Sequence, residues 1–455
     1  MEYNYRNKNF VKFFGLINNI KSSINPGMLL LFVAILTLII ANSPLQEWYL
    51  SIWQLDFFLG MGDFNFLNHH GHALTSLQLV NDGIMTIFFF SVGLEIKREV
   101  IVGELSSVRQ ALLPFLAAIG GMLVPVLLFN LTGKMQGLTP EELRGMAIPM
   151  ATDIAFSLGV LSLLGKRVPL SLKIFLMALA IVDDIGGIMV IAIFYSSFSV
   201  ESLTFLGLSL IVFAILFLGN KLRINNKLFY FISGLAVWYL FLQGGIHPTI
   251  AGVLVAFMVP ARPHLNLKVY TEGLAQDLSV IKSTMKHDHD ESIVLTNTQM
   301  KYLTRIEAAS DHVISPLQNM EDSLRDLVNF IIMPLFAFAN AGVIFDPNNF
   351  ELFSGISLSI IIGLLVGKMS GIFFFTWITL KLRISRIPKG MTWGNLSALS
   401  MLGGIGFTVA LFLAGLSYPI GSYMLNDARL GIIFGSLVAG LLGYILLRLT
   451  LKKKS

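Results

Sequence analysis

The sequence has no cysteine and little charge. Its 455 residues contain no cysteine at all, which excludes disulfide bonds, thiolate metal sites and iron–sulfur clusters. Charged residues make up only 13% of the chain, whereas soluble globular proteins average about 25%. Apolar residues make up 55%, and the mean hydropathy is +0.74. Because so few polar side chains could not cover a soluble protein of this size, a water-soluble enzyme is excluded as the first interpretation.

Long apolar runs are what the sequence has instead. A helix needs about 20 mostly apolar residues to cross about 30 Å of hydrocarbon with its backbone polar groups paired internally. Twelve runs meet this requirement and predict an all-α polytopic membrane protein, with spans numbered one to twelve at residues 27–44, 82–105, 111–130, 147–164, 171–195, 203–220, 228–243, 246–262, 327–343, 355–380, 395–416 and 430–450.

The basic residues alternate from one connection to the next. If the N-terminus is cytoplasmic, 28 of the 32 lysines and arginines lie on the inner side, three lie in outer connections and one, Lys368, lies within a span. This asymmetry predicts that both termini are cytoplasmic. A cytoplasmic segment over 1–26, one transmembrane transport domain over 27–450 and a basic tail over 451–455 are expected. The net charge of +5 is then explained by the lysines and arginines of the inner connections, and no nucleic-acid partner is expected.

Two connections are long. Residues 45–81 are predicted to form an external hairpin loop, in which the histidines of 69–72 indicate either a metal site or, preferably, a solvated loop. Residues 263–326 are predicted to form a long cytoplasmic loop containing a charged run at 287–291. Apolar residues from Met300 to Leu327 recur at three- and four-residue steps apart from one gap, which predicts an amphipathic helix on the inner surface.

Four ionisable residues lie near the middle of predicted spans: Asp153, Asp183, Asp184 and Lys368. Such residues are costly in hydrocarbon and are functional candidates by default. Salt bridging for stability is the alternative, but desolvation consumes most of the gain from a buried ion pair. Neighbouring residues on a helix point about 100° apart. We therefore expect one of the two adjacent aspartates to face Lys368 and the other to face a water-filled cavity.

The chemistry of these carboxylates favours ion exchange. Crowded, partly desolvated carboxylates retain protons near neutral pH, and small hard cations such as Na⁺ and Li⁺ prefer oxygen ligands. One site can then hold protons or a cation, but not both. If it opens to one side of the membrane at a time, it is an antiporter with no catalytic residue and no cofactor. The only metal expected is the transported Na⁺ at Asp183 and Asp184.

Spans four and eleven are expected to be broken. Pro149 and Thr152 precede Asp153 in span four, and three glycines interrupt span eleven within residues 402–408. Both segments share a Thr-x-x-x-Phe-x-x-Gly pattern, which hints at paired repeats around a midplane site. Asp153 would neutralise facing helix N-termini, and Lys368 would neutralise facing C-termini. For Asp153, cation ligation remains an equal alternative.

Ordered motifs over nearly the whole membrane region resemble those of the NhaA-type bacterial sodium/proton antiporter family. They are VNDGIM at 80–85, GLEIKRE at 93–99, ATDIAFSLG at 151–159, KIFLMALAIVDD at 173–184, GIHPTIAG at 245–252, PLFAFANAG at 334–342, GK at 367–368 and GIGFT at 404–408. The resemblance implies twelve spans and an inverted-topology repeat relating spans three to five to spans ten to twelve. The two discontinuous helices, spans four and eleven, would cross at the centre.

The resemblance also implies roles for individual residues. Asp184 would be the main cation ligand, and Asp183 would exchange a salt bridge with Lys368 during turnover. Thr152 and Asp153 match the segment beside the cation and proton site. Asp82 matches an acidic position on the outer side. The implied activity is electrogenic exchange of cytoplasmic Na⁺ or Li⁺ for external H⁺, for pH and sodium homeostasis, by a homodimer in the bacterial cytoplasmic (inner) membrane.

The family's cytoplasmic pH-responsive cluster maps onto Glu95, Arg98, Glu99 and Glu321. The sequence departs from the family pattern just after the last of these, where Asp322 and Arg325 stand in place of histidines. About fifty residues near 264–313 also have little counterpart in the pattern, and we expect them to be regulatory or a spacer.

Two other functions remain as alternatives. A cation channel would need an open polar path, whereas paired acids with an opposing lysine suit a binding site better. An intramembrane aspartyl protease also needs two membrane aspartates, but on separate helices and with one in a Gly-x-Gly-Asp motif. Asp184 is instead preceded by Ile181-Val182-Asp183.

Overall fold

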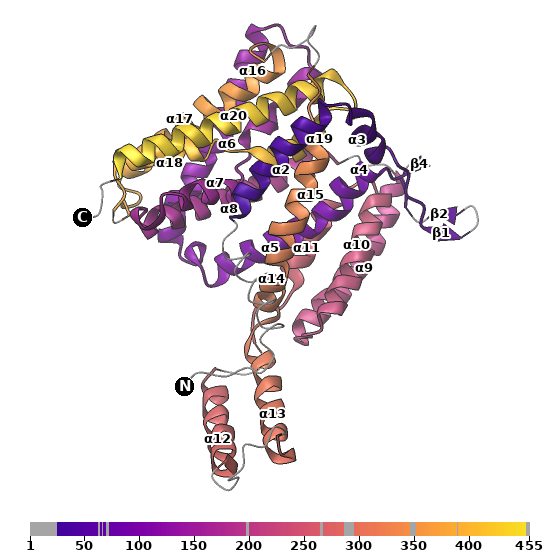
Figure 1. The fold of residues 1–455 in the computed structure, drawn as a ribbon, viewed down its shortest axis with the longest axis vertical. Helices are drawn as coiled ribbons and strands as arrows, with labels where there is room; N and C mark the ends of the chain where they lie inside the picture. Colours follow the sequence, from indigo (N-terminus) through magenta and orange to yellow (C-terminus); the bar gives the residue numbers. More distant parts are fainter. Residues whose placement is uncertain are drawn as a thin grey trace. The chain divides into compact units, whose positions relative to one another are not determined.

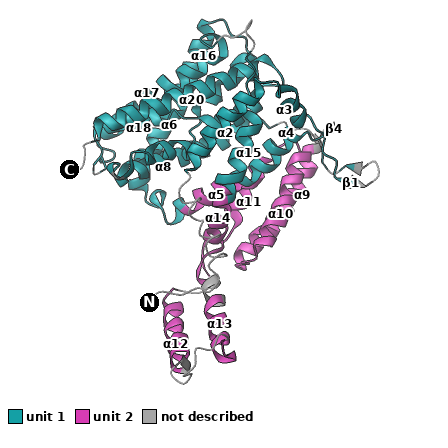
Figure 2. Ribbon diagram, in the orientation of Figure 1, with its two compact units in different colours: residues 1–88, 99–197, 327–455 teal, residues 89–98, 198–326 magenta. Residues whose placement is uncertain are grey.

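The computed structural model describes most of the chain as helix. The described residues are 25–61, 64–65, 67–69, 72–196, 200–263, 267–285, 295–345, 352–388 and 390–451. They form two compact units (Figure 2): a larger unit over residues 1–88, 99–197 and 327–455, and a smaller unit over residues 89–98 and 198–326.

Within the described residues, six helices are long and apolar enough to cross a bilayer. They are Ser76–Ile101, Val108–Met135 (α6), Leu170–Phe194 (α8), Ser202–Lys221, Gly355–Lys381 and Tyr423–Thr450 (α20). The first comprises α4 (Ser76–Gln78), the π-helical η1 (Leu79–Ile84) and α5 (Met85–Ile101), the fourth is most of α9 (Val200–Lys221), and the fifth comprises α16 (Gly355–Ile362), the π-helical η6 (Gly363–Gly367) and α17 (Lys368–Lys381).

Three further pairs of helices pass the same test together but are bent. Helices α2 (Pro26–Ala41) and α3 (Gln46–Trp53) meet at 113°. The 3-10 helix η3 (Glu142–Met150) and α7 (Ile154–Ser162) meet at 44°, as do α18 (Trp393–Leu402) and α19 (Phe407–Ser417). Counting each pair as one span raises the total to nine. The fold is therefore all-helical and polytopic, as predicted.

The second predicted span begins earlier than its apolar run. The run starts at residue 82, but the helix starts at Ser76 because Thr75 and Gln78 form a reciprocal cap. The Gln78 amide donates to Thr75 Oγ1 at 3.3 Å, and the Thr75 amide donates to Gln78 Oε1 at 2.9 Å. The helix therefore begins six residues before the apolar run, because hydropathy does not detect a polar cap.

The rest of that connection contains short hairpins. Strands β1 (Gly60–Met61) and β2 (Phe64–Asn65) pair, as do β3 (Asn68–His69) and β4 (His72–Ala73). His69 lies opposite His72 in the second pair. His70 and Gly71 lie outside the described residues, so the predicted histidine cluster stays a prediction.

Close helix packing organises the larger unit. Helix α20 packs along α16 and α18 (Figure 1), and α6 packs along α17. Gly120 of α6 lies against Gly371 of α17, so that a methyl group at Gly120 would collide with the Gly371 carbonyl and lie 2.5 Å from the Phe375 ring. The absence of side chains at this crossing lets the two backbones approach.

The smaller unit contains α9, α10 (Lys227–Gln243), α11 (Thr249–Met258) and helices from the 263–326 loop. Asn226 caps α10 by accepting from the Leu228 amide at 2.9 Å. The C-terminal end of α11 is held by two donors: Asn220 Nδ2 reaches the Met258 carbonyl and Lys97 Nζ reaches the Phe257 carbonyl, both at 2.6 Å.

The long 263–326 loop is more helical than expected. Helices α12 (Leu267–Met285) and α13 (Asn297–Val313) form a hairpin (Figure 1), with Arg305 3.5 Å from Asp277. The single amphipathic helix predicted over 300–327 is wrong. The chain forms α13 and a separate α14 (Pro316–Leu327), because Pro316 cannot continue a helix and Ser315 accepts from the Gln318 amide at 3.3 Å. The charged run at 287–291 lies outside the described residues.

Replacing Gly120 by valine is expected to destabilise the larger unit. The added side chain would separate α6 from α17, and overpacking of this kind costs about 1–3 kcal/mol of unfolding free energy. A thermal melt of the detergent-purified protein checks this as a lower midpoint. Gly207→Val on α9 is the control, because no atom lies within 4 Å of a Cβ there. Equal midpoints for the two variants would contradict the packing account.

Candidate functional site

The breaks in two of the three bent helix pairs, η3–α7 and α18–α19, meet each other. The Asp153 amide donates to the Ile405 carbonyl at 2.6 Å, and Ser157 Oγ donates to the Leu402 carbonyl at 3.1 Å. Thr152 Oγ1 lies 2.9 Å from the Gly403 carbonyl. Donors of the first broken helix thus satisfy carbonyls at the C-terminal end of α18, which irregular backbone in an apolar interior requires.

Asp153 caps the N-terminal ends of both half-helices. Its Oδ1 accepts from the Phe156 amide in α7 at 2.9 Å. Its Oδ2 accepts from the Thr408 amide at 3.1 Å and from the Thr408 hydroxyl at 2.5 Å, in the first turn of α19. The residue is only 1% exposed. These contacts are those of a carboxylate that neutralises two facing helix N-termini.

Lys368, Asp183 and Thr152 form a buried polar network. Lys368 is 0% exposed, and its Nζ donates to Asp183 Oδ2 at 2.5 Å and to Thr152 Oγ1 at 2.8 Å. The Thr152 hydroxyl has one hydrogen, which it donates either to Asp183 Oδ2 at 2.7 Å or to the Gly403 carbonyl. The ion pair is therefore connected to both helix breaks through a single hydroxyl.

Asp183 and Asp184 differ in their surroundings. Both are buried on α8, 2% and 7% exposed. Asp183 is the aspartate that contacts Lys368, and it uses Oδ2 for all of its hydrogen bonds, since its buried Oδ1 has no partner among the described residues. Asp184 also interacts electrostatically with Lys368. A buried carboxylate oxygen without a donor is a chemically suitable ligand for a proton or a hard cation.

Asp82 lies in a π-helical segment of the second span, within η1. Its neighbour Asn81 pairs with Asn340 at the end of α15 (Met333–Asn340): Asn340 Nδ2 donates to Asn81 Oδ1 at 2.8 Å, and the reverse bond is 3.4 Å. Asn340 is 1% exposed. The sequence prediction did not include this amide pair, although both residues lie in quoted motifs.

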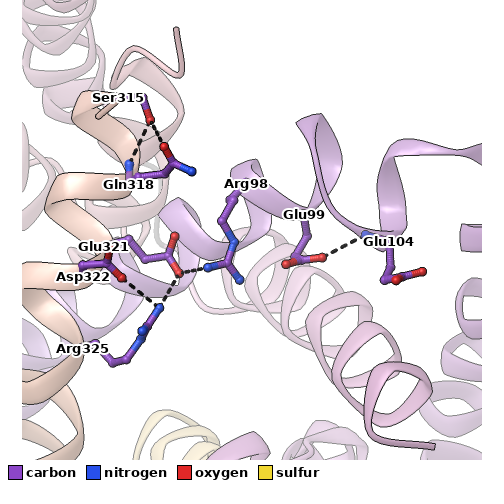
Figure 3. A network of polar contacts seen from close by, with 8 residues as sticks. All are labelled: Arg98, Glu99, Glu104, Ser315, Gln318, Glu321, Asp322 and Arg325. Atoms are coloured by element: carbon purple, nitrogen blue, oxygen red, sulfur yellow. Dashed lines mark hydrogen bonds and ion pairs between the residues drawn. The ribbon is translucent and has the colours of Figure 1, made fainter. Parts of the chain in front are cut away.

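A second polar network lies in the smaller unit (Figure 3). Arg98 Nη1 lies 2.5 Å from Glu321 Oε1, and Arg325 Nη2 lies 3.4 Å from the same oxygen. Arg325 also pairs with Asp322 at 3.1 Å. Burial raises the pKa of Glu321, while the charges of Arg98 and Arg325 lower it. The structure thus brings Arg98 and Glu321 together. It adds Arg325, which stands in place of a histidine of the family pattern.

The other two members of the predicted cluster lie on the same helix, α5. Glu95 is half-buried. In the larger unit, Glu99 accepts a hydrogen bond from the Glu104 amide at 3.0 Å, and in Figure 3 its carboxylate is directed toward Glu104. This hydrogen bond of Glu99 therefore closes the end of a helix.

Sequence reasoning missed Thr408 and Ser157 as site residues. Thr408 could have been found, because it occupies the place of Thr152 in the pattern shared by the two broken segments. Ser157 carries no such signal, since a hydroxyl on an apolar helix usually bonds within its own helix. Its donation to Leu402, 245 residues away in sequence, depends on the tertiary fold.

Comparison with known proteins matches the chain over nearly its whole length. The sequence profile of the family described as Na⁺/H⁺ antiporter 1 matches residues 18–447. The chain is 52% identical to the Na⁺/H⁺ antiporter NhaA of Phocaeicola vulgatus over 95% of each chain. It is 50% identical to the protein of that name from Bacteroides fragilis, over 95% of this chain and 97% of the relative. It is 43% identical to the protein of that name from Porphyromonas gingivalis W83, over 98% of this chain and 97% of the relative.

Removal of Lys368 alone is expected to destabilise the larger unit strongly. Lys368→Ala leaves the Asp183 carboxylate buried without its cationic partner, which costs about 3–5 kcal/mol of unfolding free energy. Lys368→Ala combined with Asp183→Ala removes both charges and is expected to recover much of the loss. Thermal melts in detergent check this, and a double variant at least as unstable as the sum of the single variants would contradict it.

Proposed function

The chain belongs to the Na⁺/H⁺ antiporter 1 family, and we propose that it exchanges cytoplasmic Na⁺ for external H⁺ as a secondary transporter. Membership confirms the family resemblance and the prediction of a transporter in place of an aspartyl protease. The proposal is carried by one observation: buried Asp183 pairs with Lys368 where two broken helices meet, with Asp184 beside it.

The exchange follows from competition for carboxylate oxygens. Na⁺ takes oxygen ligands, and here the carboxylates of Asp183 and Asp184 and the hydroxyl of Thr152 supply them. Protons neutralise the same carboxylates, and Lys368 competes for Asp183. Because a cation and protons exclude each other at one site, movement of the site between the two membrane faces couples their opposite flow. Asp153 then compensates charge at the helix ends, since both its oxygens already accept bonds there.

We propose electrogenic exchange that also accepts Li⁺. Two carboxylates at one site can carry two protons in one direction and one monovalent cation in the other. Each cycle would then move net charge, and an imposed membrane voltage would drive or reverse it. The transported ion is the substrate, so the proposal assigns no resident cofactor.

Twelve spans in an inverted repeat are the architecture we propose. Six long helices and three bent pairs account for nine spans. Helices α10 and α11 and the segment formed by the π-helical η5 (Val328–Ile332) with α15 match the remaining three apolar runs. Spans three to five would then repeat as spans ten to twelve, and the equal bends of 44° in spans four and eleven support this relation.

The protein is a multi-pass protein of the bacterial inner membrane by its relatives and its apolar helices. We propose that both termini are cytoplasmic, because the basic residues gather on that side. We further propose a homodimer, with residues 45–81 as the candidate contact, and an outer-side role for Asp82.

We propose that Glu95, Arg98, Glu99 and Glu321 regulate exchange by pH. The ion pair between Arg98 and the buried carboxylate of Glu321 supports this role, and Arg325 adds a second cation. Protonation of Glu321 removes the negative charge on which both contacts depend. The network is therefore ionic at high pH and weakened at low pH.

Asp184→Asn is expected to abolish exchange. The amide cannot take up a proton as a carboxylate does, and it donates where a cation needs an acceptor. Na⁺-driven proton movement in proteoliposomes measures this. Glu272→Gln, an exposed carboxylate on α12, is the control and should retain the wild-type rate. Normal exchange by Asp184→Asn would remove this residue as the ligand.

Glu321→Gln is expected to flatten the pH dependence of exchange. The amide fixes the neutral state, so the variant should match the wild type at low pH and differ most at high pH, where wild-type Glu321 is ionised. Initial rates in proteoliposomes from pH 6 to 9 measure this. Glu272→Gln is again the control, because this carboxylate is exposed on α12 and lies outside the network. A difference of equal size at every pH would show that the effect is not titration.

A further inference from the structure

A third irregular backbone segment meets the two helix breaks. The helix Gly355–Lys381 is continuous, but its turn at Gly363–Gly367 is π-helical, and the Lys368 amide donates to the Gly363 carbonyl, five residues back. A π-turn holds one residue more than an α-turn and is often found at functional sites. This turn ends directly before the lysine that pairs with Asp183. No pattern in the sequence predicted this π-turn.

Two glycines allow this turn to pack closely against neighbouring helices. A Cβ on Gly363 would lie 2.6 Å from the Cβ of Pro149, which belongs to the first broken helix. A Cβ on Gly367 would lie 2.7 Å from the Cα of Pro125 in α6. On the same turn, the Leu364 carbonyl touches Gly404 in the second break. The π-turn is therefore packed against both broken helices at positions where a side chain would not fit.

The hydrogen-bond register of this turn decides where Lys368 points. Each residue of an α-helix advances by about 100°. If the same residues formed a regular α-turn, the extra residue would rotate Lys368 by about that angle relative to the preceding helix. Its ammonium would then no longer reach Asp183 Oδ2, which it now contacts at 2.5 Å.

We propose that Gly363 and Gly367 are positioning residues of the exchange site. Their packing on Pro149 and Pro125 holds the π-turn, and the π-turn directs Lys368 at Asp183. The inference rests on the proposed function, because it assigns the direction of the lysine in the exchange site to the backbone turn before it.

Gly367→Ala tests the inference against Lys368→Ala as the reference. The pH profile of Na⁺/H⁺ exchange in proteoliposomes should take the form found for Lys368→Ala. Gly440→Ala is the matched control: it is buried in α20 of the same unit, and a Cβ there would meet its nearest atom at an ordinary 3.5 Å. The control should keep the wild-type profile. A folded Gly367→Ala protein with a wild-type pH profile overturns the inference. If Gly367→Ala does not fold, Gly363→Ala replaces it in the same test.

Deletion of Val366 separates register from packing damage. Val366 is 54% exposed, and removing one residue lets the turn become a regular α-turn while Lys368 keeps its direction. The deletion should retain the wild-type pH profile, although it is a larger change than one methyl group. If packing damage alone caused the effects, the Val366 deletion would change the pH profile more than Gly367→Ala does. A Lys368→Ala profile for the deletion, with a wild-type profile for Gly367→Ala, overturns the inference.

A melting cycle keeps the inference testable independently of transport. In the wild type, Lys368→Ala should lower the thermal midpoint, but in the Gly367→Ala background it should lower it less, since the ion pair is already lost. An unchanged effect of Lys368→Ala in that background overturns the positioning role. Absence of exchange by the wild-type protein would instead overturn only the proposed function.

Discussion

The interior of this protein must hold an ammonium group that is completely buried. Lys368 is fully buried, and an unpaired charge there would cost far more free energy than the fold could supply. Asp183 provides the opposite charge, and Thr152 provides the remaining acceptor. Both partners come from other helices, so the lysine can be buried only when three separate helical segments are assembled around it.

The two helix breaks are subject to the same requirement that buried polar groups be paired. A broken helix exposes carbonyl groups on one side of the break and amide groups on the other, and neither is tolerated unpaired in an apolar interior. Here the two breaks pair with each other, and the Asp153 carboxylate accepts hydrogen bonds from backbone amides at the N-terminal ends of both half-helices. The resulting polar centre is surrounded by apolar packing. A polar centre can therefore lie in the apolar interior without the chain losing its backbone hydrogen bonds.

Features set by local apolar residues were predictable, whereas features set by polar caps or by distant residues were not. Apolar run length is a local property, so the predicted runs coincide with helices. The onset at Ser76 and the break before Pro316 were missed, because capping by Thr75 and Ser315 involves polar residues that hydropathy ignores. Helix α12 was missed because its polar face made it resemble a solvated loop.

The sequence by itself determined the membrane character, the family and the inventory of buried ionisable residues, because composition and motif order suffice for these. It also required that adjacent aspartates on one helix face different surroundings. Only the tertiary structure decided that Asp183 is the partner of Lys368, a residue 185 positions away. It likewise decided the π-turn before that lysine, because packing against Pro125 and Pro149, far away in the chain, selects the hydrogen-bond register.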